Sequence, residues 1–156
     1  MLDGARVPDL LDCGRCDCRR VSWEVPLNKR KTGSRYETLA ARYLEKKGYL
    51  IVHQNYRCRA GEIDLIARDE AEGWRCLVFI EVKYRKNGAA GLPEEAVNVN
   101  KRRRISRAAD YFRMQYRIPM DMPCRFDVIA IEGDRLRNHV NAFAYEEYRG
   151  MNRRRY

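Results

Sequence analysis

No continuous run of 18 apolar residues occurs in this sequence, so we expect no helix that spans a membrane. The N-terminal part also lacks the continuous apolar segment that a secretory signal requires. Six cysteines without an export signal are typical of free thiols in a reducing compartment, which predicts a cytoplasmic protein. Of the 156 residues, 45% are apolar, which is enough to form the core of one folded domain.

Several kinds of catalytic site are also missing. Histidine occurs only as His53 and His139, both on predicted strands, where histidines are more often packed than catalytic. No grouping of nucleophile, base and orienting residue suggests a serine or cysteine hydrolase. Gly88 and Gly91 do not have the spacing of a phosphate-binding glycine loop. The charged residues are therefore the main candidates for function.

Residues 1–31 show no clear hydrophobic period, and we expect them to form a flexible extension outside a folded domain of residues 32–145. Cys13, Cys16 and Cys18 in this extension have the tight spacing of a metal knuckle. We do not expect zinc there, because a structural zinc site normally needs four ligands and a fourth could come only through tertiary contact. A zinc-dependent interaction module is the alternative. Residues 146–156 form a basic tail.

Positive charge is concentrated in one part of the chain. The net charge is +10, and residues 98–125 contribute +6 of it, with two aspartates and eight basic residues: Lys101, Arg102, Arg103, Arg104, Arg107, Arg113, Arg117 and Arg125. A concentrated basic element suggests a polyanionic partner, above all nucleic acid. The alternative is a solvated basic helix face.

Apolar periodicity predicts two helices and five strands. A first helix would be capped by Ser34 with Glu37 and would stop at Gly48. The other predicted elements are strands at 50–55, 61–67 and 76–85, a helix from about 94 to 115 opened by Pro93, and strands at 125–131 and 135–140, followed by a closing segment at 141–145. This order predicts a mixed sheet with helices packed against it, an α/β sandwich.

Two of these strands carry charges in an otherwise apolar context. Glu62 and Asp64 are two residues apart on one strand, and Glu81 and Lys83 are two apart on the next. Residues two apart share one face of a strand, so three carboxylates and one ammonium would gather on one side of a hairpin. Burying such charges costs several kcal/mol unless they are paired or bind a metal. A metal-dependent active site is one explanation, and a structural ion cluster is the other.

The second helix adds one more charge to this region. Lys101 lies between Val97 and Ile105 at spacings of four, so we expect it on the core-facing side, while Arg102, Arg103 and Arg107 point elsewhere. The alternative for Lys101 is a side chain that covers apolar surface and keeps its charge in water.

At this point the sequence resembles a known family. Glu37, the segment Gly61–Asp64 (GEID) and the segment Phe79–Arg85 (FIEVKYR) look like the YraN-like family of small bacterial proteins. That family is similar to the PD-(D/E)XK nucleases, close to archaeal Holliday-junction resolvases and RecB-type nuclease domains. The match runs from about Gly33 to Phe143 and includes Lys101 and the segment Arg125-Phe126-Asp127. It implies a restriction-endonuclease-like αβββαβ core.

The resemblance also implies roles for particular residues. Asp64 and Glu81 would be metal ligands, the backbone carbonyl of Val82 a third, and Lys83 the catalytic lysine. Ile63 replaces the proline of the superfamily's Pro-Asp pair, which leaves the ligand aspartate in place. Mg²⁺, or Mn²⁺, fits carboxylate and water oxygens.

Three further residues keep two interpretations each. Glu37 resembles the helix-one glutamate that completes such sites, but a helix cap would tie its carboxylate to the backbone. Glu62, at the start of its strand, either supports the site or has a solvated or salt-bridged role. Arg85 holds a phosphate or pairs with one of the glutamates, Glu62 or Glu81.

The sequence thus predicts a Mg²⁺-dependent nuclease acting on DNA, including branched or structured DNA. The expected catalytic residues are Glu37, Asp64, Glu81 and Lys83, and the expected nucleic-acid contacts are Arg85, Lys101, Arg102, Arg103 and Arg107. The alternative is a non-catalytic nucleic-acid-binding protein that keeps this fold, because phosphate contacts need no metal. Resolvase-like nucleases often work as dimers, so a homodimer is a further expectation.

Overall fold

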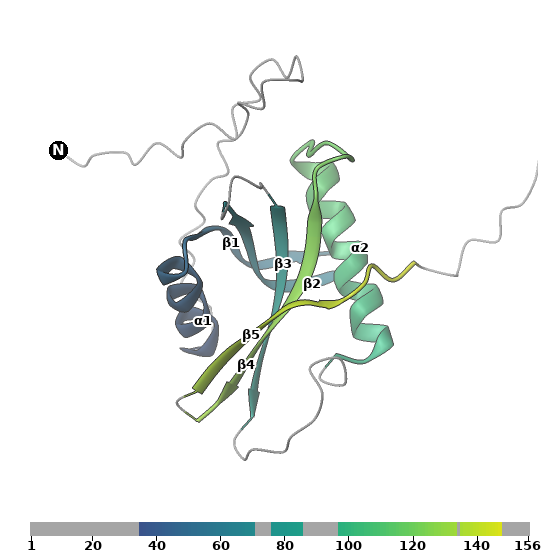
Figure 1. Ribbon diagram of the computed structural model, residues 1–156. Helices are drawn as coiled ribbons and strands as arrows, with labels where there is room; N and C mark the ends of the chain where they lie inside the picture. Colours follow the sequence, from purple (N-terminus) through teal and green to yellow (C-terminus); the bar gives the residue numbers. More distant parts are fainter. Residues whose placement is uncertain (1–34, 71–75, 86–96, 134, 148–156) are drawn as a thin grey trace, which may run out of the picture.

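The predicted order of elements is confirmed by a computed structural model, which describes residues 35–70, 76–85, 97–133 and 135–147. The expected extension at 1–31, most of the basic tail and the loop from 86 to 96 lie outside these residues. In chain order the elements are α1 (Arg35–Lys46), β1 (Tyr49–Cys58), β2 (Gly61–Asp69), β3 (Cys76–Arg85), α2 (Val99–Gln115), β4 (Cys124–Glu132) and β5 (Arg135–Phe143) (Figure 1).

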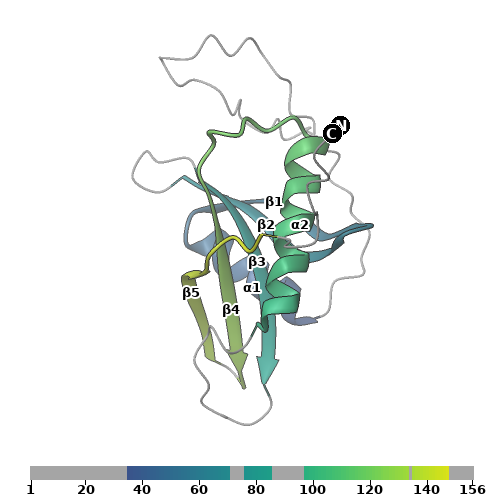
Figure 2. The ribbon, with the colours of Figure 1, turned by 90° about the vertical axis from the view of Figure 1, so that its right-hand side faces the viewer.

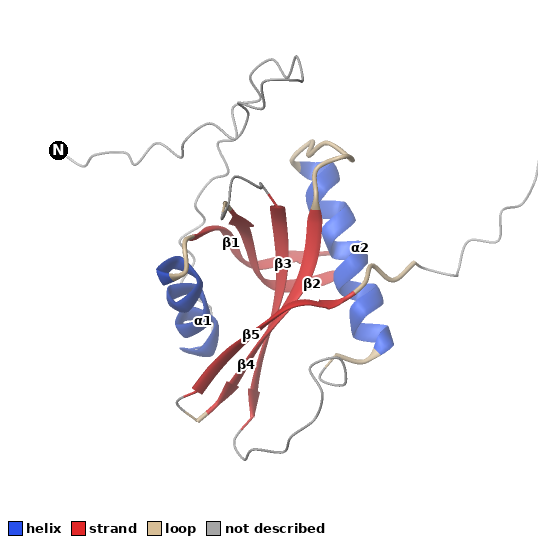
Figure 3. Cartoon of the chain, in the orientation of Figure 1, coloured by secondary structure: helices blue, strands red, loops and turns tan. Residues whose placement is uncertain are grey.

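The five strands form one mixed sheet in the order β1-β2-β3-β4-β5 (Figure 3). β1, β2 and β3 are antiparallel neighbours, and β4 and β5 are also antiparallel. β3 and β4 run parallel, so the chain crosses over between them through α2. α1 and α2 cover opposite faces of the sheet, which gives the expected α/β sandwich (Figure 2).

Each helix packs on its own apolar cluster because side chains alternate between the two faces of the strands. On the α1 side, Ala40 and Leu44 contact a cluster that includes Leu65 and Ile80. On the α2 side, the buried residues form a larger, aromatic cluster that includes Ile105, Ala108, Phe112, Phe79 and Phe126. Charged residues on β2 and β3 that point to the α2 side must therefore fit beside a tightly packed apolar layer.

The ends of the helices follow local sequence signals, with one correction. Gly48 adopts a positive φ of 88° directly after α1, as expected for a helix stop. Ser34, the expected cap of α1, lies outside the described residues. The second helix does not include residues 97 and 98: it begins at Val99, and the Asn98 side chain accepts a hydrogen bond from the Lys101 backbone N–H. Asn98 is thus the N-cap of α2. The helix begins after this cap and not at Pro93, which was expected to open it.

Every strand except β3 extends beyond the range predicted from its apolar residues. β5 continues to Phe143 through Asn141, whose φ is 53°, so the expected closing segment at 141–145 is largely the end of this strand. The register shift between Phe126 and Val128 accommodates this irregularity in β5. No helix in the described part of the chain is long and apolar enough to cross a membrane.

Candidate active site

The centre of the site lies where β2 and β3 stop pairing. The last paired residues of the two strands are Leu65 and Ile80, so Asp64 and Glu81 come next, one on each strand. The Asp64 Oδ2 atom accepts a hydrogen bond of 2.7 Å from the Val82 backbone N–H. The structure therefore brings the two carboxylates expected as metal ligands together with the main chain of Val82, the residue expected to supply a third ligand.

Glu81 is a buried carboxylate with an asymmetric environment. Its side chain is only 3% exposed, and its Oε1 atom lies 2.8 Å from Lys83 Nζ and 3.3 Å from Lys101 Nζ. Its Oε2 atom is buried and has no hydrogen-bond partner among the described residues. Leaving a buried carboxylate oxygen unpartnered costs free energy, so this atom is a natural position for a cation.

Asp64 holds its proton much more strongly than an ordinary aspartate. The pKa of Asp64 is raised to about 7, chiefly by burial and then by the neighbouring Glu81 carboxylate, while the Val82 N–H and Lys101 act in the opposite direction. At neutral pH the carboxyl group is therefore divided between its two protonation states. A divalent cation would stabilise the ionised form and so compete with this proton.

The two other glutamates considered for the site, Glu37 and Glu62, have different environments. Glu37 stands in the first turn of α1, is partly buried, and its charge contributes to the raised pKa of Asp64. The Glu62 side chain is 54% exposed, with its carboxylate oxygens 3.7 Å from Lys101 Nζ and 3.8 Å from Arg57 Nε. Glu62 is thus both salt-bridged and solvated.

The donor set fits Mg²⁺ better than a metal that needs a closed protein cage. Within the described residues no group of three or more His, Cys, Asp or Glu side chains is arranged to hold a metal. Mg²⁺ usually takes only one or two protein carboxylates and keeps waters or substrate phosphates as its other ligands. Asp64 and the free Oε2 atom of Glu81 meet that requirement. Cys13, Cys16 and Cys18 lie outside the described residues.

Lys101 reaches the site because α2 approaches the start of β2 closely. A Cβ atom added to Gly61 would lie 3.2 Å from the Arg104 carbonyl oxygen of α2, which only glycine avoids. From this position Lys101 extends to both Glu81 and Glu62 and is 25% exposed. The inward direction expected for Lys101 is confirmed.

The arginines expected to bind nucleic acid do not form one uniform face. Arg107 is exposed, whereas Arg85, Arg102 and Arg103 are partly buried. The Arg102 Nε atom donates a 2.7 Å hydrogen bond to the Val97 carbonyl, and its guanidinium lies 5.7 Å from the centre of the Phe143 ring. Arg102 therefore also supports the chain that leads into α2.

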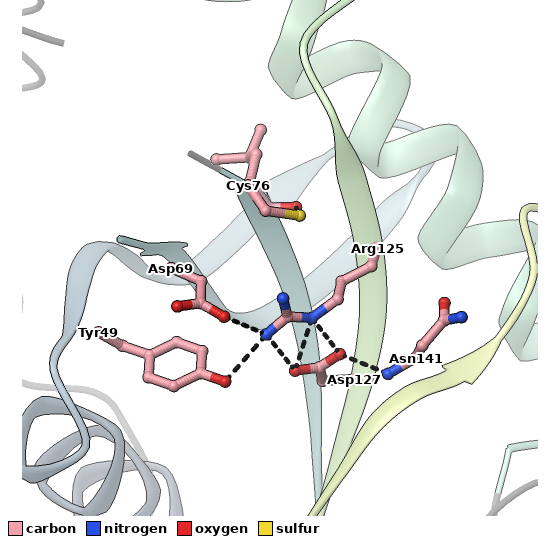
Figure 4. A network of polar contacts seen from close by, with 7 residues as sticks. Tyr49, Asp69, Cys76, Arg125, Asp127 and Asn141 are labelled. Atoms are coloured by element: carbon pink, nitrogen blue, oxygen red, sulfur yellow. Dashed lines mark hydrogen bonds and ion pairs between the residues drawn. The ribbon is translucent and has the colours of Figure 1, made fainter. Parts of the chain in front are cut away.

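A second polar cluster surrounds Arg125. The sequence indicated Arg125 and Asp127 only as part of the family match. Arg125 donates to Asp127 Oδ1 at 3.1 Å, to Asp69 Oδ2 at 2.8 Å and to the Tyr49 hydroxyl at 2.9 Å (Figure 4). The fully buried Asp127 also accepts a 2.8 Å hydrogen bond from the Asn141 N–H, at the bulge of β5. Figure 4 shows that this cluster ties β1, β2, β4 and β5 together.

The signal for this cluster was present in the sequence. Arg125 and Asp127 are two residues apart on an apolar strand, the same pattern as Glu62 with Asp64 and Glu81 with Lys83. Their charges satisfy each other, and no buried oxygen of Asp127 is left without a partner in the described part of the chain. This cluster is therefore a structural tie, and the Glu81 site is the one with unused capacity for a ligand.

A five-stranded mixed sheet flanked by two helices, with paired carboxylates on adjoining strands, is compatible with a restriction-endonuclease-like core. Comparison with known proteins gives the family. The family described as "Uncharacterised protein family UPF0102" matches residues 36–131. A UPF0102 protein of Lachnoclostridium phytofermentans is 47% identical over 117 residues, which cover 75% of this chain and 96% of the relative. One from Photobacterium profundum is 43% identical over 110 residues, or 70% and 85% of the two chains. The chain belongs to the UPF0102 family, which confirms the YraN-like resemblance.

Proposed function

We propose that this protein is a Mg²⁺-dependent nuclease that hydrolyses phosphodiester bonds of DNA, including branched or structured DNA. The observation that carries the proposal is the environment of Glu81: a buried carboxylate with one oxygen held by two lysines and the other oxygen without a partner among the described residues. Simple stabilisation of the fold gives no reason for that second oxygen to stay unsatisfied. A cation-binding role does.

Asp64 and Glu81 would hold the metal, with the Val82 carbonyl as a third ligand. When bound, Mg²⁺ supplies a water of lowered pKa and neutralises charge on the phosphate. Lys83 is 34% exposed, so its ammonium reaches solvent while it contacts Glu81. From there it is placed to hydrogen-bond an attacking water or a phosphate oxygen. Lys101 adds a second positive charge on the same side.

The proposed DNA contacts follow from the positive charge of α2. Residues 98–125 carry a net charge of +6, and Lys101 and Arg107 belong to the same helix. Arg85 lies two residues after Lys83 on β3, and Arg102 and Arg103 complete the proposed set. Phosphate neutralisation by such residues predicts binding that weakens steeply with salt. Localisation in the cytoplasm and assembly as a homodimer stay predictions.

The test is to incubate the protein with branched, nicked and single-stranded DNA in the presence of Mg²⁺ or Mn²⁺. We expect cleavage that is abolished by EDTA and lost in Glu81→Ala and in Lys83→Ala. Glu45→Ala and Lys46→Ala are matched controls, since both side chains are exposed at the end of α1. Cleavage that survives in both site variants would reject the assignment.

A second candidate is a nucleic-acid-binding protein without catalytic activity. It is favoured by the pairing of Glu81 with two lysines, because this arrangement already neutralises the carboxylate without a metal. This candidate predicts DNA binding with a steep salt dependence, no cleavage of any of these substrates, and no heat of Mg²⁺ binding by calorimetry. The nuclease predicts a measurable heat that disappears in Asp64→Asn.

A further inference from the structure

One aromatic pair differs from the other ring contacts in the described part of the chain. The rings of Tyr36 on α1 and Tyr84 on β3 are stacked, with centroids 3.9 Å apart and planes inclined by 16°. Tyr36 packs against the apolar cluster on the α1 side, whereas Tyr84 is 41% exposed. Tyr84 is thus the more exposed residue of the stack.

This Tyr36–Tyr84 stack lies on the α1 side of the sheet, next in sequence to two proposed catalytic residues. Tyr36 directly precedes Glu37 and Tyr84 directly follows Lys83. Because successive side chains of a strand point to opposite faces, the Tyr84 ring lies on the other face of β3 from the Lys83 side chain. The charge of Glu37 acts on Asp64, so the first turn of α1 lies near the carboxylate centre. The stack therefore joins the two elements, α1 and β3, that carry proposed catalytic residues.

The geometry of the stack suits a ligand with a flat aromatic surface. Phe79, Phe112 and Phe126 are each buried within the α2-side cluster, where apolar burial explains their contacts. Tyr84 lacks such cover, and its parallel contact with Tyr36 orients the ring without burying it. A pre-oriented aromatic side chain loses little entropy when a ligand stacks on it.

We propose that the Tyr36–Tyr84 stack is a platform for one unpaired nucleobase, and that the substrate class is nucleic acid with single-stranded nucleotides. This inference rests on the proposed function. A base inside a duplex has both faces covered by its neighbours, so only an unpaired or terminal base is free to stack on a protein ring. Every base has an aromatic face, so the platform would select for strand state and not for sequence.

The test uses binding without divalent metal, so that cleavage is not needed for a readout. Oligonucleotides carrying the fluorescent base analogue 2-aminopurine are titrated in EDTA, once as a single strand and once as a duplex. Loss of one base–aromatic stack weakens binding by roughly 5- to 150-fold. We expect a loss in that range for Tyr84→Ala with the single strand and less than twofold with the duplex. Quenching of 2-aminopurine should also disappear.

Two variants separate stacking from a structural role. Tyr84→Phe keeps the ring and should keep both affinity and quenching. Tyr145→Ala removes a different exposed tyrosine, 49% exposed and hydrogen-bonded to Asp110, and should bind like the wild type. Equal losses on single strand and duplex, or no loss on either, would overturn the proposal. So would a changed molecular mass of Tyr84→Ala with unchanged affinity, because that result would assign the ring to a contact between two copies.

The result is independent of whether the protein cuts DNA. Single-strand binding and quenching that depend on Tyr84, with no cleavage in Mg²⁺ or Mn²⁺, would support the platform and reject the nuclease. Cleavage by Tyr84→Ala with unaltered single-strand affinity would support the nuclease and reject the platform.

Discussion

Lys101 Nζ on α2 lies 3.3 Å from Glu81 Oε1 on β3, the same oxygen that Lys83 Nζ contacts at 2.8 Å. Two ammonium groups on one oxygen leave the Oε2 atom of Glu81 without a partner in the described part of the chain. The pairing also sets the electrostatics of Asp64, since Lys101 lowers its pKa while Glu81 raises it. This relationship makes the charge balance of the site adjustable by single substitutions.

The first prediction concerns the proton on Asp64. Lys101→Met should raise the pKa of Asp64 above its value of about 7, because a neighbouring positive charge is removed. Glu81→Gln should lower it, because a neighbouring negative charge is removed. Titration of the Asp64 carboxyl carbon by NMR, in metal-free buffer, measures both shifts. Lys46→Met, on the exposed end of α1, should change nothing; identical titrations in all four proteins would contradict the described site.

The second prediction concerns stability against pH. The pKa of Asp64 is raised in the folded state, so the folded protein binds the proton more tightly than the unfolded chain does. This contribution to stability is present at pH below about 4 and is lost as the pH rises through about 7. Urea unfolding of the metal-free protein at pH 5 and pH 8 should therefore show that Asp64→Asn gains stability relative to wild type at the higher pH.

Addition of Mg²⁺ tests the same carboxyl group from the other side. A metal that binds only the folded protein stabilises it by mass action. At pH 8, Mg²⁺ should therefore raise the urea midpoint of unfolding of the wild type and leave that of Asp64→Asn unchanged. Asp121→Asn, at an exposed aspartate, serves as the control. A stability difference between Asp64→Asn and wild type that is constant with pH would show that this proton is not linked to folding.

The third prediction concerns the structural tie around Arg125. Arg125→Ala leaves the fully buried Asp127 without its charged partner, which should destabilise the protein by about 3–5 kcal/mol. The double variant Arg125→Met with Asp127→Asn should recover part of that loss, because no uncompensated charge remains. Chemical denaturation measures both. Arg57→Ala, which removes an exposed pair at 3.8 Å, should have little effect; a similar loss there would argue against a special role for burial.

The fourth prediction concerns Gly61, the first residue of the GEID segment. Gly61→Ala places a Cβ atom 3.2 Å from the Arg104 carbonyl oxygen, so α2 has to shift, at a cost of roughly 1–3 kcal/mol. The shift should also move Lys101 away from Glu81 and reduce DNA cleavage more than stability alone explains. Gly48→Ala strains a positive φ without meeting any atom within 4 Å, so it should lower the unfolding midpoint and leave cleavage intact.

The sequence by itself determined the order and type of the elements. Alternation and apolar periodicity are local properties, and they gave seven elements in the observed order, with β3 at its observed bounds. The bounds that were missed depend on other signals. Asn98 caps α2 later than Pro93 suggested, and β5 extends past Val140 because Asp127 holds the Asn141 N–H at a bulge.

The sequence also determined which residues carry unusual charge, but not what that charge does. The same spacing of two residues occurs in Glu62 with Asp64, in Glu81 with Lys83, and in Arg125 with Asp127. Only the tertiary structure decided that Arg125 and Asp127 satisfy each other as a tie, whereas Glu81 keeps an oxygen without a partner among the described residues. The physical reason is that the free energy of a buried charge depends on the atoms around it. Those atoms come from strands and helices that are distant in the sequence.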